Sequence, residues 1–333
     1  MPLEQRIGQL FMVGTDDPTP EESLQALVAD NHIGSVLYLG AGPWTAALTR
    51  EASATIAAWG GDVPVLLAAD QEGGQIQRLD GSGFSDMPSA AQQGRMTPAA
   101  LEAKWRGWGK ELRDAGVLFD LAPVADVVPP GIDAQNAPVG ALDRNFGTTR
   151  ETVAASASAA VRGLTGARVA SSLKHYPGLG RTDTNTDFGV AHDDATEATD
   201  VADYQAPMDA GASSVMISSS IYSEIDPGVP AVFSKKIING LLREGQGWTK
   251  VVISDDLGAA QAVADVPVRE RGLRFLQAGG DLVINADPAK ITEMVDGVGD
   301  HAVADEAFAA EIDQHAARVL ALKASVGLLQ CSA

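Results

Sequence analysis

Residues 251–256 read Val-Val-Ile-Ser-Asp-Asp, a short apolar run that ends abruptly in two carboxylates. The run does not alternate between apolar and polar positions, which is typical of a strand buried on both faces of a parallel sheet. Seven further apolar runs of this kind occur along the chain. They are Leu10–Gly14, Ser35–Leu39, Val65–Ala69, Leu118–Val124, Val169–Leu173, Ser214–Ser218 and Asp281–Asn285. The sequence therefore predicts eight parallel, buried strands.

Segments with a helical period separate these runs. In the segment 100–115, apolar residues recur every three or four positions, as on the buried face of a helix. Ser234 fits a helix N-cap, and Gly279 fits a helix stop. The other predicted helices are Glu151–Leu164, Ala195–Ala210, Ser234–Leu242, Val266–Ala278 and a terminal helix over residues 305–330 that packs on the rest of the fold.

Eight strand–helix units within 333 residues predict an α/β fold, a (β/α)₈ TIM-type barrel. A doubly wound open sheet is the competing architecture, but no G-x-G-x-x-G turn follows any of the runs. The chain contains no internal repeat or low-complexity linker, so residues 1–333 are expected to form a single domain.

Composition excludes several kinds of partner. The chain has 44 acidic and 24 basic residues and a formal net charge of −20, which disfavours nucleic acid and anionic membrane surfaces. Its single cysteine, Cys331, excludes an intrachain disulfide. No apolar run approaches the ~18 residues that span a bilayer. The N-terminus lacks a signal-peptide pattern, so a cytoplasmic location is expected, or an exported or lipid-anchored one if a leader has been removed.

Polar residues gather where the predicted strands end, and the carboxyl ends of barrel strands share one face. Polar and charged side chains gathered on one face suit a polyhydroxylated ligand. Each hydroxyl needs donors and acceptors in fixed positions, and charged side chains form stronger hydrogen bonds with hydroxyls than neutral ones do. A carboxylate at a strand end can also attack an anomeric carbon. A metal site is the weaker reading, since no H-E-x-x-H motif is present. The sequence does not predict an oligomeric state.

Five ordered motifs resemble the N-acetylglucosaminidase branch of glycoside hydrolase family 3, over nearly the whole chain. They are Asp70-Gln71-Glu72-Gly73-Gly74 with Gln77-Arg78, Ala122-Pro123-Val124-Ala125-Asp126, Arg144-Asn145-Phe146-Gly147, Lys174-His175-Tyr176-Pro177-Gly178 and Ser254-Asp255-Asp256-Leu257. The resemblance implies a barrel that needs no metal or organic cofactor and a small carbohydrate substrate containing N-acetylglucosamine, as in peptidoglycan turnover. It also implies that Asp255 is the nucleophile. The implied sugar-binding residues are Asp70, Arg78, Arg144, Lys174, His175 and Met216.

One departure from the family pattern concerns the acid/base. The branch reads Asp-Ser-His in the loop after the lysine–histidine motif, and its last histidine is the acid/base. This chain reads Asp187-Phe188-Gly189 there, so the histidine is missing. Asp187 could protonate the leaving group itself if Phe188 supplied an apolar environment that raises its pKa. His192 could replace the histidine after a loop rearrangement, or nothing replaces it.

The expected function is therefore a retaining glycoside hydrolase that removes terminal non-reducing β-N-acetylglucosamine, or a related β-hexose, through a glycosyl-enzyme on Asp255. The alternative is a non-catalytic or weakly active sugar-binding homologue, and a glycoside phosphorylase is less favoured. Taken alone, Asp255 would be read as a helix cap. Among five ordered motifs the nucleophile role is favoured, and Asp256 is expected to be the cap. Asp126 and Asp281 are expected to be structural.

Overall fold

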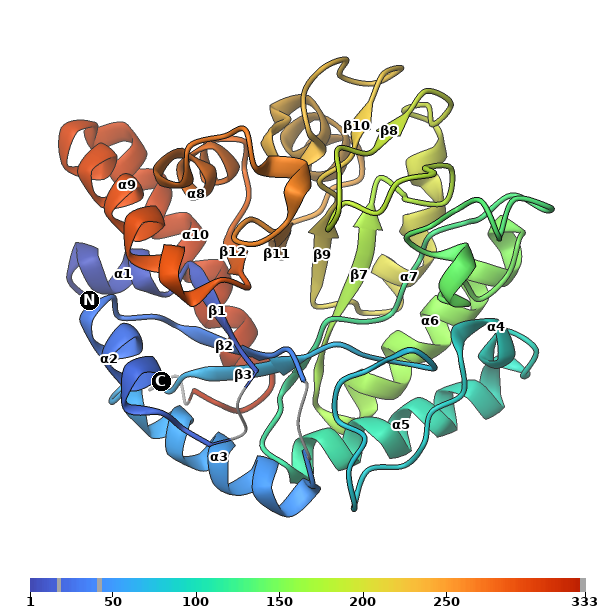
Figure 1. The fold of residues 1–333 in the computed structure, drawn as a ribbon, viewed down its shortest axis with the longest axis horizontal. Coiled ribbons are helices and arrows are strands. Elements are labelled where there is room, and N and C mark those ends of the chain that lie inside the picture. The colour runs from blue at the N-terminus through green and yellow to red at the C-terminus, as the bar shows by residue number, and fades with distance from the viewer. Residues whose placement is uncertain (17–18, 41–43, 330–333) are drawn as a thin grey trace.

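The computed structural model describes residues 1–16, 19–40 and 44–329, so Cys331 lies outside it. Eight parallel strands form a closed barrel in the order β1-β12-β11-β9-β7-β6-β3-β2 (Figure 1). Their bounds are β1 (Phe11–Thr15), β2 (Ser35–Tyr38), β3 (Leu66–Ala69), β6 (Phe119–Asp120), β7 (Ala170–Tyr176), β9 (Ser214–Ile217), β11 (Val251–Asp256) and β12 (Leu282–Asn285). Each overlaps one of the eight predicted runs, so the predicted barrel is confirmed.

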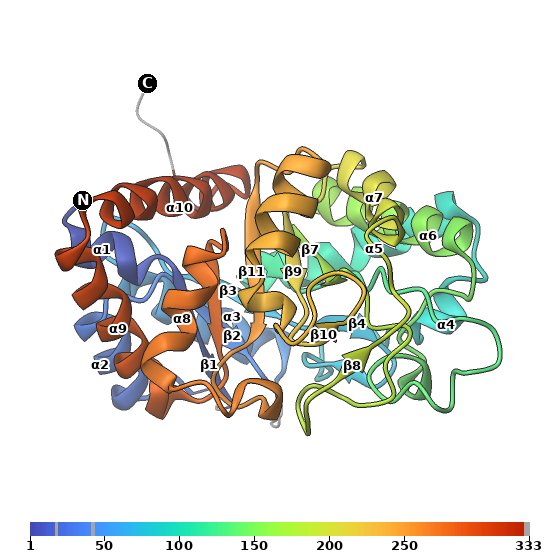
Figure 2. The same cartoon turned by 90° about the horizontal axis from the view of Figure 1, so that it is seen from above.

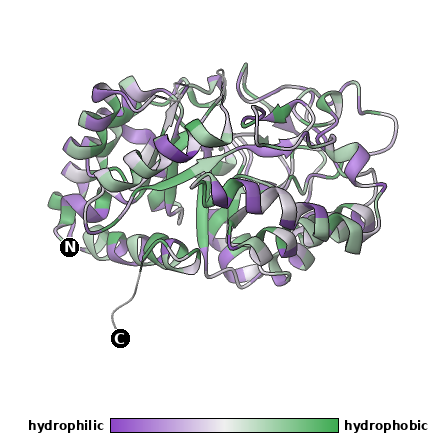
Figure 3. Cartoon of the chain, turned by 90° about the horizontal axis from the view of Figure 1, so that it is seen from below, coloured by the Kyte–Doolittle hydropathy of each residue, from purple (hydrophilic) through white to green (hydrophobic). Residues whose placement is uncertain are grey.

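Helices surround the barrel, and the longer ones bury apolar residues in the core that they share with the strands. Their bounds are α1 (Leu3–Gly8), α2 (Glu22–Asp30), α3 (Ala46–Trp59), α4 (Ala90–Gln93), α5 (Pro98–Asp114), α6 (Arg150–Ala167), α7 (Gln205–Asp209), α8 (Val268–Gln277), α9 (Ile291–Ala304) and α10 (Glu306–Ser325). Figure 3 shows hydrophobic residues along the strands and mixed surfaces on the helices. No helix in the described ranges combines the length and hydropathy needed to cross a bilayer.

The predicted helix over residues 195–210 is wrong in its first part. Only a 3₁₀ turn, Asp200–Tyr204, and the short α7 are helical there. The carboxylate of Asp193 accepts the backbone amides of Ala195 and Thr196 at 2.9 and 2.7 Å, which fixes a turn in place of a helical start.

The predicted helix over residues 234–242 is present in a different form. Residues Lys236–Gly245 wind as a π-helix, and Ser234 Oγ accepts the amide of Ile237 at 3.1 Å, as expected of a capping side chain. The terminal helix α10 ends at Ser325, before the predicted end, and Gly327 beyond it has a φ of +81°.

Helix α10 packs across the amino ends of the barrel strands, at the edge of the molecule opposite β8 (His192–Asp193) in Figure 2. Its fully buried Lys323 donates to Gln9 Oε1 at 2.6 Å and to the carbonyl of Pro64 at 2.9 Å. Asp281, expected to be structural, is buried at this end in an ion-pair cluster. The partners of Asp281 are Arg243, His315 and Arg318. The amino end of the barrel is therefore closed by structural contacts.

Two short strand pairs outside the barrel were not predicted. β4 (Gln71–Gly73) pairs with β5 (Ile76–Gln77) directly after β3, and β8 pairs with β10 (Ile221–Tyr222) in the loops after β7 and β9. Both pairs lie in loops at the carboxyl end of the barrel, where they fix segments that carry polar residues.

Candidate active site

A cavity of about 400 Å³ opens at the carboxyl ends of the strands. Its polar lining comes from the ends of β3, β7 and β11 and from the loops that follow β5, β6 and β7. Eight of the nine residues that the sequence analysis placed in the site line this one cavity. They are Asp70, Arg78, Arg144, Lys174, His175, Asp187, Met216 and Asp255. The ninth, His192, does not.

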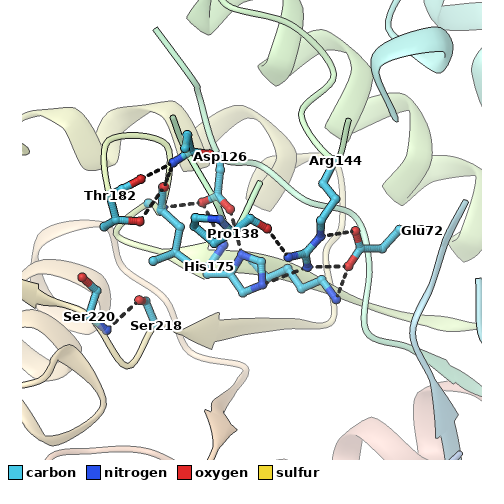
Figure 4. Close-up of polar contacts among 12 residues, drawn as sticks. Glu72, Asp126, Pro138, Arg144, His175, Thr182, Ser218 and Ser220 are labelled. Carbon is cyan, nitrogen blue, oxygen red and sulfur yellow. Dashed lines mark hydrogen bonds and ion pairs between the residues drawn. The ribbon is translucent and has the colours of Figure 1, made fainter. Parts of the chain in front are cut away.

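Two cations in the cavity are held by one buried carboxylate, that of Glu72 (Figure 4). Arg144 donates to both Glu72 oxygens at 2.8 Å, and Lys174 Nζ lies 2.7 Å from Glu72 Oε1 and 2.6 Å from Asp70 Oδ1. Burial acts to raise the pKa of Glu72, but Arg144 and Lys174 outweigh it and hold that pKa well below its usual range. All three groups therefore stay charged, in fixed positions.

His175 is oriented by Asp126. Its Nδ1 lies 2.7 Å from Asp126 Oδ2, while Asp126 Oδ1 accepts the amides of His175 and Leu179. Arg144 Nη2 lies 3.3 Å from His175 Nε2. Because a guanidinium can only donate, His175 Nε2 is the acceptor. Nδ1 therefore carries the ring proton and donates it in a hydrogen bond to Asp126. The expected structural role of Asp126 thus includes setting the tautomer of a cavity-lining histidine.

The two carboxylates that end β11 have different surroundings. Asp256 accepts four backbone amides at 2.7–2.9 Å, from Gly258, Ala259, Ala260 and Ala286, so it fixes the turn after β11 against the end of β12. The predicted helix cap is wrong, because the next α-helix, α8, begins only at Val268. Asp255 Oδ1 accepts only the amide of Asp256, at 2.9 Å. No side chain in the described ranges bonds Asp255 Oδ2, and the residue lines the cavity. Burial, reinforced by Asp187 and opposed by His175, raises the pKa of Asp255 to about 6.

Asp187 reaches the same cavity from the loop after β7. Its amide donates to Asn185 Oδ1 at 2.9 Å, and its carbonyl accepts the amide of Gln261, in the loop after β11, at 3.3 Å. A second backbone bond, 3.1 Å from the Ala262 amide to the Thr186 carbonyl, joins the same two loops. The loop that carries Asp187 is thereby tied to the loop that follows Asp255.

The pKa of Asp187 is raised by burial and by the negative charge of Asp256, against the opposing charge of Arg144. The expected contribution of Phe188 to this shift is not observed, because its ring is 82% exposed. His192 lies exposed on β8, where it pairs with Ile221, so the structure does not bring it to Asp255.

Arg78 forms no ion pair with any carboxylate in the described ranges. It lines the cavity, and its buried Nε has no hydrogen-bond acceptor among the described residues. A ligand oxygen would satisfy it. Within residues 1–16, 19–40 and 44–329, no group of three or more His, Cys, Asp or Glu side chains is placed to hold a metal ion.

The family model of the glycosyl hydrolase family 3 N-terminal domain matches residues 2–322. The chain belongs to glycosyl hydrolase family 3. A crystal structure of β-N-acetylhexosaminidase from Beutenbergia cavernae is similar to this family 3 chain, with a TM-score of 0.92 and 44% identity over 97% of this chain and 99% of that one. β-Hexosaminidase LpqI of Mycobacterium tuberculosis is 31% identical over 328 residues, 96% of this chain and 82% of its own length. A β-hexosaminidase of Xanthomonas oryzae is 34% identical over 246 residues, 71% of each chain. The resemblance read from the motifs is confirmed.

The sequence analysis of this family 3 chain missed Glu72 as a site residue. The signal was present, since Glu72 stands two positions after Asp70 in the first motif. Its importance depends on Arg144, in a loop, and Lys174, on β7, which reach it from distant parts of the chain, so no local pattern reveals it.

Glu72→Gln is expected to lower the free energy of unfolding by about 3–5 kcal/mol, because it leaves two buried cations short of one carboxylate. Urea unfolding monitored by circular dichroism measures the loss. The matched control is Glu102→Gln, which breaks more exposed pairs with Arg106 and Arg162 and should cost about 1 kcal/mol or less. Equal losses in the two variants would contradict the assignment.

Proposed function

We propose that this family 3 protein is a retaining glycosidase that removes terminal non-reducing β-N-acetylglucosamine from a carbohydrate. One observation carries the proposal: Asp255 lines the cavity that Arg144 and Lys174 also line, and its Oδ2 has no hydrogen-bond partner among the described residues. Similarity to β-N-acetylhexosaminidases supports N-acetylglucosamine as the sugar. Asp70, Arg78 and His175 complete a set of fixed donors and acceptors for its hydroxyls.

The reaction proceeds in two displacements. Asp255 Oδ2 attacks C1, the bond from C1 to the glycosidic oxygen breaks, and that oxygen takes the proton of Asp187. Water then attacks C1 of the glycosyl-enzyme while Asp187 accepts its proton, which releases the sugar and restores Asp255. The chemistry requires one carboxylate to be ionised and the other protonated at the start, and the raised pKa values of Asp255 and Asp187 support a proton held by one of them.

Release of p-nitrophenol from a panel of β-glycosides tests the proposal, and the N-acetylglucosaminide should be the best substrate. Saturable binding of N-acetylglucosamine without turnover of any activated glycoside would identify a sugar-binding protein instead. Formation of a sugar 1-phosphate, with acceleration in phosphate buffer, would identify a phosphorylase. Either outcome overturns hydrolysis.

The pH dependence tests the ionisation of Asp255. A protonated carboxyl cannot attack, so kcat/KM on an activated aryl substrate should fall about tenfold per pH unit below about pH 6. The charge of Asp187 contributes to the raised pKa of Asp255, so Asp187→Asn should move this acid limb to lower pH. A 2,4-dinitrophenyl glycoside is the substrate of choice, because its leaving group needs no acid.

Asp183→Asn is the control for that measurement, since Asp183 is an exposed carboxylate of the same loop and does not line the cavity. Its acid limb should match the wild type. If the acid limb of Asp187→Asn lay at the same pH as in the wild type, or at a higher pH, the charge of Asp187 would not act on Asp255.

A further inference from the structure

The loop of residues 183–190 presents an unusually exposed aromatic ring. Four large apolar side chains are exposed among the described residues, and two of them, Phe188 and Val190, lie on this loop. Phe188 is the most exposed of the four, at 82%. It also lines the cavity, next to Asp187. Single exposed apolar residues are common on protein surfaces, so its place in the cavity wall is the informative observation.

Backbone hydrogen bonds order the turn that carries this ring. The amides of Phe188 and Gly189 donate to the carbonyl of Asn185 at 3.0 and 3.1 Å, which closes a tight turn. The flanking bond from the Gln261 amide to the Asp187 carbonyl anchors the turn to the loop after β11. The aromatic side chain is therefore presented by an ordered backbone before any ligand arrives.

The position of the ring relative to Asp187 determines which part of a substrate it meets. A general acid must lie within about 3 Å of the glycosidic oxygen, so Asp187 marks the boundary between the bound sugar and its leaving group. Lys174 and His175 lie on β7 itself, whereas Asp187 and Phe188 follow in the loop beyond that strand. Other apolar side chains also line this cavity. Among them are Leu39, Ile76, Leu142 and Ala259.

We propose that Phe188 is a platform for the leaving group, and that the protein selects substrates whose leaving group has a flat apolar face, such as a pyranose or an aryl ring. The proposal rests on the proposed function, because the role of Asp187 places the leaving group beside Phe188. The C–H face of a pyranose packs on an aromatic ring and removes apolar surface of both from water.

The test compares a β-1,4-linked disaccharide of N-acetylglucosamine with methyl β-N-acetylglucosaminide. Phe188→Ala should lower kcat/KM on the disaccharide roughly tenfold, mostly through KM, and leave the methyl glycoside within about twofold of the wild type. Phe188→Tyr, which keeps an aromatic ring, should have a kcat/KM on the disaccharide close to that of the wild type. Val303→Ala, at a similarly exposed position on α9, is the control and should change neither substrate.

An equal loss on both substrates would overturn the platform and show that Phe188 acts through the loop. No loss on either would overturn it as well. The dissociation constants of sugars for Asp255→Asn, measured by calorimetry, distinguish a failure of the platform from a failure of the proposed function. Even if the wild type hydrolyses no glycoside, the platform requires the disaccharide to bind about tenfold more tightly than N-acetylglucosamine and Phe188→Ala to remove that difference.

Discussion

Asp255→Asn is expected to reduce hydrolysis of p-nitrophenyl N-acetylglucosaminide by on the order of 10⁴–10⁶-fold, as removal of a nucleophile does in other hydrolases. Asp256 cannot take over, because its oxygens are occupied by four backbone amides. The asparagine keeps an oxygen for the Asp256 amide, so the local backbone is retained. Initial rates at saturating and limiting substrate measure the loss.

The stability of the same variant distinguishes a lost nucleophile from a lost fold. The pKa of Asp255 rises from 3.8 to about 6 on folding, so the folded state binds the proton more tightly and its stability falls as pH rises between these values. Asn removes that cost. The Tm of Asp255→Asn should therefore exceed the wild-type Tm at pH 8 and approach it below pH 4. A lower Tm at pH 8 would mean that the inactivity has a structural cause.

Covalent trapping identifies the attacking atom directly. Exposure to a 2-deoxy-2-fluoroglycoside should leave a sugar on Asp255, which mass spectrometry of peptides locates. A label on Asp187, or on any other residue, would reject the nucleophile assignment even if Asp255→Asn were inactive.

Asp187→Ala is expected to lower kcat/KM by about 10²–10⁴-fold on methyl or disaccharide substrates and much less on 2,4-dinitrophenyl glycosides, because only poor leaving groups need a proton. Azide should restore turnover of the activated substrate by attacking the glycosyl-enzyme, with the β-glycosyl azide as product. A plot of log kcat/KM against the pKa of the leaving group measures the effect, and its slope should be steeper in the variant.

His192→Ala provides the comparison for that series. His192 is exposed on β8 and does not line the cavity, so its loss should change the rates on every substrate by less than about twofold. If His192→Ala gave the leaving-group dependence and Asp187→Ala did not, the acid/base would be the histidine. If neither variant did, the protein would work without a general acid.

The barrel was predictable because a strand buried on both faces is mostly apolar and does not alternate, a pattern that is complete within a few residues of sequence. The strand-end residues were predictable for a related reason, since parallel strands bring their carboxyl ends to one face. The prediction of a helix over residues 195–210 was wrong in its first part because the carboxylate of Asp193 binds the amides of Ala195 and Thr196. The spacing of apolar residues carries no information about such a side-chain hydrogen bond.

The remaining features of the site depend on segments that are distant in sequence. Glu72 binds cations more than 70 and 100 residues away, at Arg144 and Lys174, so its ion pairs exist only once the barrel has closed. The exposure of Phe188 and the placement of His192 outside the cavity likewise depend on how one loop turns. The residue types in the loop do not determine which way its side chains point.

The two backbone bonds between the loop of Asp187 and the loop that follows Asp255 constrain protein engineering. A designer who wished to transplant a histidine-bearing loop from a relative into this scaffold would have to replace both segments as one cassette. Unless a single grafted loop placed its carbonyls where those of Thr186 and Asp187 lie, the amides of Gln261 and Ala262 would lose their acceptors and the new loop would not be fixed relative to Asp255.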